Sequence, residues 1–248
     1  MTIPSPGQSV WHLGPLPIRA YSLLMVLAVA AGLWLTRRRM RARGGDPGLI
    51  VEIATWAVPF GIVGARLYHV ATTWERYADD PLKIFMTWEG GLGIYGALAG
   101  GALGAWIACR RIGVPLRDFA DLVAPGIALG QAIARWGNWF NQELYGSPTT
   151  LPWGLEIDGS PYLHHPAFLY ESLWDLGVMV LLLSVNLDRG RLFALYAVAY
   201  ATGRVWIEML RVDPAYHLLG LRLNVWTSLV VLVVALVYLV RTRPTRLT

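Results

Sequence analysis

The stretch Arg135–Gly146, RWGNWFNQELYG, gathers a guanidinium, three side-chain amides and a carboxylate inside a largely apolar part of the chain. A guanidinium can bind phosphate oxygens at two points, and amides and carboxylates can hold it in place. On a helix, Arg135, Asn138 and Gln142 would stack along one side, because residues three and four apart are neighbours. With Glu143 on a flanking face, the stretch predicts an anion-binding site. Ordinary polar residues at a helix end are the simpler alternative.

A second cluster lies in GRVWIEMLR, where Arg204, Glu208 and Arg211 are spaced to share one helix face. Two arginines around one glutamate leave a surplus positive charge, which suits an anionic ligand. An internal salt bridge that only lowers the cost of burying charge is the alternative.

The third cluster is HHPAFLYE, residues 164–171. Pro166 after His165 is typical of a helix start, and Glu171 one turn later could orient an arginine. His164 is expected to be solvated in a loop. No two histidines have metal-ligand spacing on a helix, so we expect no metal site.

The composition indicates a membrane protein rather than a soluble one. Of 248 residues, 55% are hydrophobic and only 15% are charged, whereas soluble domains are about a quarter charged. The net charge of +5 therefore fits cytoplasmic loops and anionic lipids better than nucleic acid, which we do not expect as a partner. The single cysteine, Cys109, excludes an intramolecular disulfide and is expected to be a small buried apolar residue.

Seven apolar runs approach the 20 or so residues that a membrane helix needs. The N-terminal segment lacks the pattern of a removable signal peptide, so the first run is expected to remain as a span. We predict an all-α, polytopic membrane protein with one membrane-embedded domain over residues 1–248. The runs are roughly 17–36, 48–71, 91–109, 118–134, 166–187, 191–211 and 222–240.

The distribution of Arg and Lys predicts the orientation of these spans. Most of them fall after the first, third and fifth runs and in the C-terminal tail, in RRRMRAR, RRIGVPLR, DRGR and RTRPTR. The positive-inside rule then places the N-terminus outside and the C-terminus in the cytoplasm. This topology puts all three polar clusters near the outer half of the membrane, where burying each charge costs about 2.5–3.5 kcal/mol and calls for pairing, water or a ligand.

Two further features have mainly structural interpretations. Gly96, Gly100 and Gly104 form a ladder of small residues that predicts close packing against another helix. The outer segment WERYADDPLKIF mixes aromatic and charged residues, as an arm at the membrane interface would. At this point a phospholipid-using enzyme and a transporter or flippase for an anionic lipid or solute both remain open, although no convincing internal repeat favours the transporter.

Five segments, in order along nearly the whole chain, resemble the bacterial prolipoprotein diacylglyceryl transferases. ARWGNWFNQELYG is similar to the most specific motif of that family, an arginine followed by G-N-x-x-N-x-E-x-x-G. The other four are GPLPIRAYSLL, EGGLGIYGALAGG, HPAFLYE and GRVWIEMLRVD. The resemblance implies a multi-pass enzyme of the bacterial plasma (inner) membrane with its active site toward the outer face.

The resemblance also implies the reaction. Such an enzyme transfers the diacylglyceryl group of phosphatidylglycerol to the lipobox cysteine thiol of a preprolipoprotein, forming a thioether and releasing glycerol phosphate. The attacking sulfur belongs to the substrate, so the enzyme needs no nucleophile of its own, and no cofactor is expected. Its partners would be phosphatidylglycerol, lipobox-bearing preprolipoproteins and the surrounding membrane lipids.

Residue roles follow from the matching positions. Catalytic roles fall to Arg135, Arg204, Glu143, Glu208, Asn138 and Tyr21. Phosphatidylglycerol binding falls to Arg135, Asn138, Gly146, Arg204 and Tyr95. Supporting roles fall to Glu171, His165 and Arg211.

Tyr95 stands where many family members carry a histidine proposed as the base for the thiol. A tyrosine, with an ordinary pKa of about 10, is a poor proton acceptor at neutral pH. We therefore expect charge stabilisation by Arg135 and Arg204, with a thiolate favoured near them. The identity of the base stays open.

Overall fold

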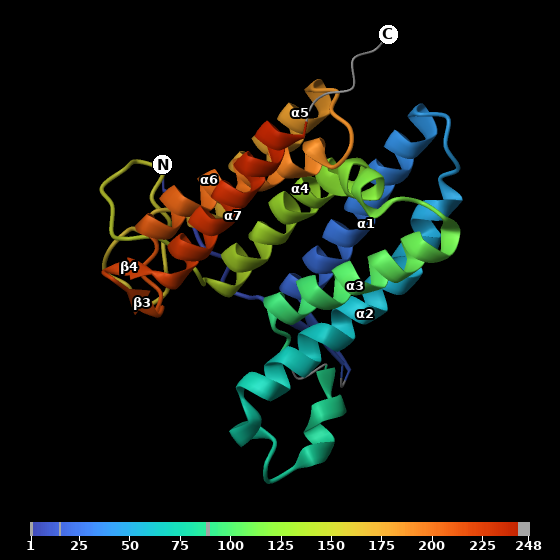
Figure 1. Ribbon diagram of the computed structural model, residues 1–248. Coiled ribbons are helices and arrows are strands. Elements are labelled where there is room, and N and C mark those ends of the chain that lie inside the picture. Colours follow the sequence, from blue (N-terminus) through green and yellow to red (C-terminus); the bar gives the residue numbers. More distant parts are fainter. Residues whose placement is uncertain (1, 15, 88–89, 243–248) are drawn as a thin grey trace. The chain divides into compact units, whose positions relative to one another are not determined.

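The computed structural model describes residues 2–14, 16–87 and 90–242, and the chain is mainly helical (Figure 1). Glu89 of the glycine-rich motif, and Arg243 and Arg246 of the basic tail, lie outside these residues. The order is β1 (Val10–Leu13), β2 (Leu16–Arg19), α1 (Ala20–Ala42), α2 (Gly48–Thr72), η1 (Trp74–Arg76), η2 (Pro81–Phe85), α3 (Ile94–Ile112), α4 (Leu116–Asn141), α5 (Ala167–Ser184), α6 (Arg191–Leu210), β3 (His217–Leu218), β4 (Leu221–Arg222) and α7 (Leu223–Arg241).

Each of the seven predicted runs corresponds to one long helix of the described residues. Four of them, α1, α2, α5 and α7, are long and apolar enough to cross a membrane. The helix of the third run, α3, is not among the four because it is rich in glycine and ends in Arg110 and Arg111. The chain is therefore a multi-pass helical membrane protein, and the count of seven spans stays a prediction.

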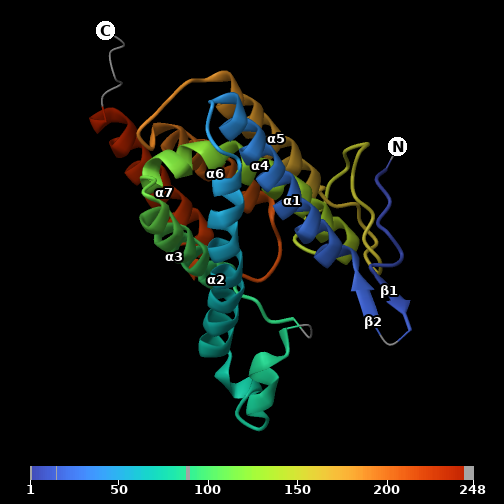
Figure 2. The same cartoon turned by 90° about the vertical axis from the view of Figure 1, so that its right-hand side faces the viewer.

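The helix boundaries differ from the predicted ones in two places that matter. Residues 17–19 belong to β2, which pairs with β1 in an antiparallel hairpin (Figure 2), so the first helix begins only at Ala20. This hairpin and the short β3–β4 hairpin are exceptions to the predicted all-α fold. The fourth helix is longer than the predicted run of 118–134, because it begins at Leu116 and continues to Asn141.

Asp121 explains how the polar start of α4 is accommodated. Its carboxylate accepts hydrogen bonds from the backbone amides of Gly190, at 2.7 Å, and Phe193, at 2.8 Å. These amides lie at the start of α6, where backbone N–H groups have no partner within the helix. The buried aspartate therefore caps a neighbouring helix and fixes α4 against it.

The chain divides into two compact units. Unit 1 comprises residues 1–36 and 120–248, and unit 2 comprises residues 37–119. The core of unit 1 lies between α4, α5 and α6 and contains buried Ala128, Leu182 and Leu192. In Figure 1, α4 to α7 run side by side, and α6 packs on both α5 and α7.

Unit 2 is built on the close pairing of α2 and α3. A Cβ atom added to Gly96, Gly100 or Gly104 would lie 2.1–2.6 Å from a backbone oxygen of α2. Only glycine allows the two backbones to approach so closely, so the predicted packing role of this ladder is confirmed. Cys109 is buried among apolar side chains of the same pair, as expected.

Arg66 holds the segment that connects these two helices. Its side chain is buried, and its guanidinium donates to backbone oxygens of Lys83, Ile84, Met86, Gly90 and Gly91. An arginine has five N–H donors, and here all are used to gather one loop. The charge that interrupts the second apolar run therefore anchors the predicted interfacial arm.

We expect Arg66→Lys to loosen this arm, because a lysine has only three donors and cannot reach all these carbonyls. Amide hydrogen exchange in residues 74–87 should accelerate at least tenfold. Arg76→Lys, on an exposed residue of the same arm, is the matched control and should leave exchange unchanged. Equal protection in Arg66→Lys and the parent chain would show that the guanidinium does not hold the arm.

Candidate active site

Arg135 lies in the last two turns of α4, within unit 1, as the predicted anion-binding stretch requires. Its Nε atom is 2.9 Å from Oε2 of Glu171, which lies in the second turn of α5. Both side chains are largely buried, with 18% and 5% of their surfaces exposed. Glu171 therefore orients Arg135, as its spacing after Pro166 predicted.

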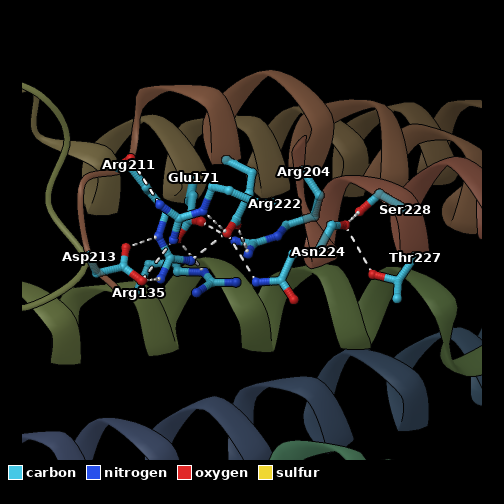
Figure 3. A network of polar contacts seen from close by, with 10 residues as sticks. Arg135, Glu171, Arg204, Arg211, Asp213, Arg222, Asn224, Thr227 and Ser228 are labelled. Atoms are coloured by element: carbon cyan, nitrogen blue, oxygen red, sulfur yellow. Dashed lines mark hydrogen bonds and ion pairs between the residues drawn. The ribbon is translucent and has the colours of Figure 1, made fainter. Parts of the chain in front are cut away.

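Arg204 of α6 bridges two carboxylates. Its Nη1 atom donates to Oε1 of Glu171, and its Nη2 atom donates to Oε2 of Glu208 at 2.6 Å. Glu171 thus receives one arginine on each oxygen. The resulting chain, Arg135–Glu171–Arg204–Glu208, connects three helices through alternating charges (Figure 3).

Glu208 is the most heavily bonded group of this network. Its side chain is fully buried, and Arg204 and Arg211 both donate to its Oε2 atom. Its Oε1 atom accepts from Arg222 Nε at 2.9 Å and from Asn224 Nδ2 at 3.0 Å. Four donors fill both oxygens, so this carboxylate is fixed in position and direction.

Asp213 closes the network in the loop between α6 and α7. Its carboxylate accepts from Arg211 Nε at 2.7 Å and from Arg222 Nη2 at 2.9 Å. Burial alone would raise the pKa of this carboxyl, but the hydrogen bonds and charges of Arg211 and Arg222 together lower it. Asp213 is therefore ionised at neutral pH and holds both arginines toward Glu208.

A small pocket borders the Arg135–Arg204 end of the network. Asp175, one turn after Glu171 on α5, contributes a buried carboxyl to its wall. The network itself holds four arginines and three carboxylates. It therefore carries one positive charge when Asp175 is protonated and is neutral when Asp175 is ionised. The pocket is lined by Arg135, Glu171, Trp174, Asp175, Tyr200, Gly203, Arg204 and Ile207.

The end of α4 differs from the predicted stack. Asn138 Nδ2 donates to Glu143 Oε1 at 2.9 Å, and Asn141 Nδ2 donates to the same oxygen at 3.2 Å. Gln142 does not continue the helix face, because the helix ends at Asn141 and Gln142 has a positive φ of 52°. Its side chain instead bonds Asp158 in the following loop. The prediction that Gln142 stacks below Arg135 was wrong.

Tyr21, in the first turn of α1, packs its ring against Gly137. A Cβ atom at Gly137 would lie 2.5 Å from the ring, so this position of the motif must be glycine. The Tyr21 side chain interacts electrostatically with Arg135 and Glu143. The structure therefore brings Tyr21 to the central motif. Tyr95 belongs to unit 2, where its half-exposed ring lies 5.8 Å from that of Tyr68.

Gly146 lies where the loop after α4 meets the end of α6. Its N–H donates to the backbone oxygen of His165 at 2.9 Å, and it bridges to Arg211. His165 contributes through its backbone, and its ring Nδ1 lies 3.3 Å from the Tyr170 hydroxyl. His164, expected to be solvated, is buried, because its Nδ1 atom bonds the Gly146 oxygen at 2.9 Å.

Four residues of this site were not singled out in the sequence: Asp175, Asp213, Arg222 and Asn224. Asp175 could have been found, since it lies four residues after Glu171 and shares its helix face. Asp213 follows Arg211 in the VDP sequence, but Arg222 and Asn224 lie beyond a turn. Only the β3–β4 hairpin brings them back to Glu208.

The chain matches a known protein family over almost its whole length. Residues 8–241 match the family model described as prolipoprotein diacylglyceryl transferase. The chain belongs to this family. The resemblance carried by the five motifs is thereby confirmed, and the arginine–carboxylate network contains residues from three of them.

Curated relatives in the family cover nearly the whole chain. A Streptomyces griseus protein named phosphatidylglycerol–prolipoprotein diacylglyceryl transferase is 55% identical over 96% of this chain and 77% of its own length. One of two Streptomyces coelicolor proteins of that name is 55% identical over 98% of this chain and 76% of its own. A Mycobacteroides abscessus protein of the same name is 51% identical over 96% of this chain and 77% of its own length.

The lowered pKa of Asp213 predicts how acid affects stability. A carboxyl whose pKa is lower in the folded state stabilises the fold above its unfolded pKa of about 3.9, and this contribution is lost as the pH falls through the folded value. Asp213→Asn should therefore melt at a lower temperature than the parent chain, by a constant margin from pH 8 to about pH 5.

Below about pH 4 the margin should shrink, since the parent chain then loses the same charge. Tryptophan fluorescence during thermal unfolding in detergent measures this. Asp79→Asn, on an exposed carboxylate of unit 2, is the control and should show no margin. The stabilising role of ionised Asp213 would be contradicted if the melting temperatures of Asp213→Asn and the parent chain were equal at neutral pH. It would also be contradicted if their difference grew on acidification.

Proposed function

We propose that this chain transfers the diacylglyceryl group of phosphatidylglycerol to the cysteine thiol of prolipoproteins, the reaction that the names of its relatives state. One observation carries the proposal: Arg135 and Arg204 are held by Glu171 beside a pocket. Such an arrangement presents fixed guanidinium groups to an anionic headgroup.

The chemistry needs charge stabilisation rather than a protein nucleophile. The sulfur of the substrate cysteine attacks the glycerol carbon that carries the phosphate, forming the thioether bond. The bond between that carbon and the phosphate oxygen breaks, and its electron pair leaves with glycerol phosphate. Arg135 and Arg204 would neutralise the charge that grows on the departing phosphate, because they are already in place before it develops.

The other site residues then have distinct parts. Glu171 and Glu208 hold Arg204 from both sides, and Arg211 helps to fix Glu208. Glu143 accepts a hydrogen bond from the side-chain amide of Asn138 and would orient that amide toward the headgroup.

Three further residues complete the proposed site. Tyr21 would complete the catalytic set next to the central motif, where its ring packs on Gly137. Gly146, anchored by the backbone of His165, would shape the site near the end of α6. Tyr95 would bind and orient the lipid. We infer that both compact units act together as a single transferase domain over residues 1–248.

The proposed topology has seven spans in the bacterial inner membrane, with the N-terminus outside, the C-terminus in the cytoplasm and the active site toward the outer face. The ends of the helices in unit 1 support it. Site residues occupy the last two turns of α4 and α6, the second turn of α5 and the first turn of α7. Arg191 begins α6, Arg241 ends α7, and Arg189 lies in the connection between α5 and α6, as the cytoplasmic side requires.

The function is tested with purified protein, phosphatidylglycerol vesicles and a lipobox peptide. We expect the peptide to gain the mass of one diacylglyceryl group and its Cys→Ser counterpart to gain none. No gain on either peptide, together with movement of the lipid between vesicle leaflets, would instead support a transporter of anionic lipid.

Arg204→Ala should lower the transfer rate at least 100-fold, because losing one preorganised donor costs about that much. The rate is measured in membranes with protein levels matched by quantitative blotting. Arg241→Ala removes the same charge from the exposed end of α7 and should keep the parent rate. A normal rate in Arg204→Ala would rule out charge stabilisation by this guanidinium.

A further inference from the structure

Asp175 is a buried carboxyl that the proposed mechanism does not yet use. Only 3% of its surface is exposed, and it lines the pocket together with Arg135 and Arg204. Both arginines interact with it electrostatically. Within residues 2–14, 16–87 and 90–242, however, no group donates a hydrogen bond to its oxygens. Among the described residues, the one fully enclosed side-chain N or O atom without a partner is Arg191 Nε, so the unbonded Asp175 oxygens keep some accessible surface.

The other carboxylates of the site already accept hydrogen bonds from arginine or amide side chains. Each oxygen of Glu171 binds an arginine, and those of Glu208 accept from four side chains. Glu143 accepts two amides through one oxygen, and Asp213 is held by two arginines. Protonating Glu171, Glu208 or Asp213 would break part of the framework that holds the guanidiniums. Glu143 bonds amides rather than a guanidinium, but the residue is exposed and is not part of the pocket wall.

Asp175 differs from these carboxylates in its position and in its hydrogen bonding. It lines the pocket, and because no described group donates to its oxygens, a proton added to them displaces no hydrogen bond. A general base must reach the proton that it removes, and a group on the pocket wall can do so when the substrate enters. The nearby guanidiniums would also stabilise the thiolate that forms beside them.

We propose that Asp175 is the group that accepts the proton of the substrate cysteine thiol, an inference that rests on the proposed transferase function. The S–H bond breaks as its proton passes to an Asp175 oxygen, and the sulfur electron pair forms the new S–C bond. The C–O bond to the phosphate breaks, and glycerol phosphate leaves as a dianion between Arg135 and Arg204. Asp175 then gives its proton to this phosphate, which restores the carboxylate and balances the reaction.

A selenocysteine peptide separates this role from a structural one. A selenol is already ionised at neutral pH, so its attack requires no base. Asp175→Asn should therefore transfer the lipid to the cysteine peptide at least 100-fold more slowly than the parent chain, since general-base catalysis contributes about 10²–10⁴-fold. With the selenocysteine peptide, its rate should stay within threefold of the parent rate.

The ratio of the two rates within one protein is independent of how much of that protein is folded. Asp121→Asn changes another buried aspartate, the one that caps α6, and should keep the parent ratio. Asp175→Glu retains a carboxyl and should recover a substantial part of the cysteine activity. If Asp175→Asn does not fold, Asp175→Ser, with a smaller polar side chain, repeats the measurement.

An equal loss on both peptides in the Asp175 variants would overturn the assignment while leaving the transferase function standing. Full activity of Asp175→Asn on the cysteine peptide would overturn it as well. Failure of the parent chain to modify either peptide would refute the proposed function itself, and this inference with it.

Discussion

The arrangement of unit 1 around its site depends on the need to pair charges that are buried in an apolar chain. Glu208 is fully buried and accepts from three guanidiniums and an amide. Removing one partner from such a buried pair typically costs about 3–5 kcal/mol, since an uncompensated charge remains. The network therefore constrains where the ends of α4 and α6 and the starts of α5 and α7 can lie.

Such a network is not explained by stability alone. Replacing buried ion pairs with well-packed apolar residues is often neutral or stabilising, so a chain that only had to fold could omit these arginines. Burying the arginines with their partners costs desolvation free energy. In return, the positive charges are already oriented before a ligand arrives. That preorganisation is what stabilises a developing negative charge most effectively. Among the residues that the structure describes, the same framework leaves the Asp175 carboxyl without a hydrogen-bond donor beside the pocket, where the proposed reaction needs a proton acceptor.

The positions of the long helices and part of the site could be predicted from the sequence, for physical reasons. Membrane helices have a strong length and hydropathy requirement, so the apolar runs located the seven long helices of the described residues, four of which are long and apolar enough to cross a membrane. The family motifs pointed to Arg135, Arg204 and Glu208, which the structure joins in one network. The boundary at Asn141 was missed because one positive φ at Gln142 ends the helix inside the motif. Arg222 was missed because its contact with Glu208 depends on a hairpin, which local periodicity does not predict.

The central claim is that the Arg135–Arg204 pair binds the lipid phosphate, and solid-state NMR tests it directly. Protein labelled with ¹⁵N-arginine is reconstituted with phosphatidylglycerol, and the ³¹P signal of the bound lipid is measured with and without ¹⁵N dephasing. The account predicts strong dephasing, corresponding to phosphorus within roughly 4 Å of a guanidinium nitrogen, and its marked weakening in Arg204→Lys. No dephasing in the parent protein, or equal dephasing in the variant, would contradict the account.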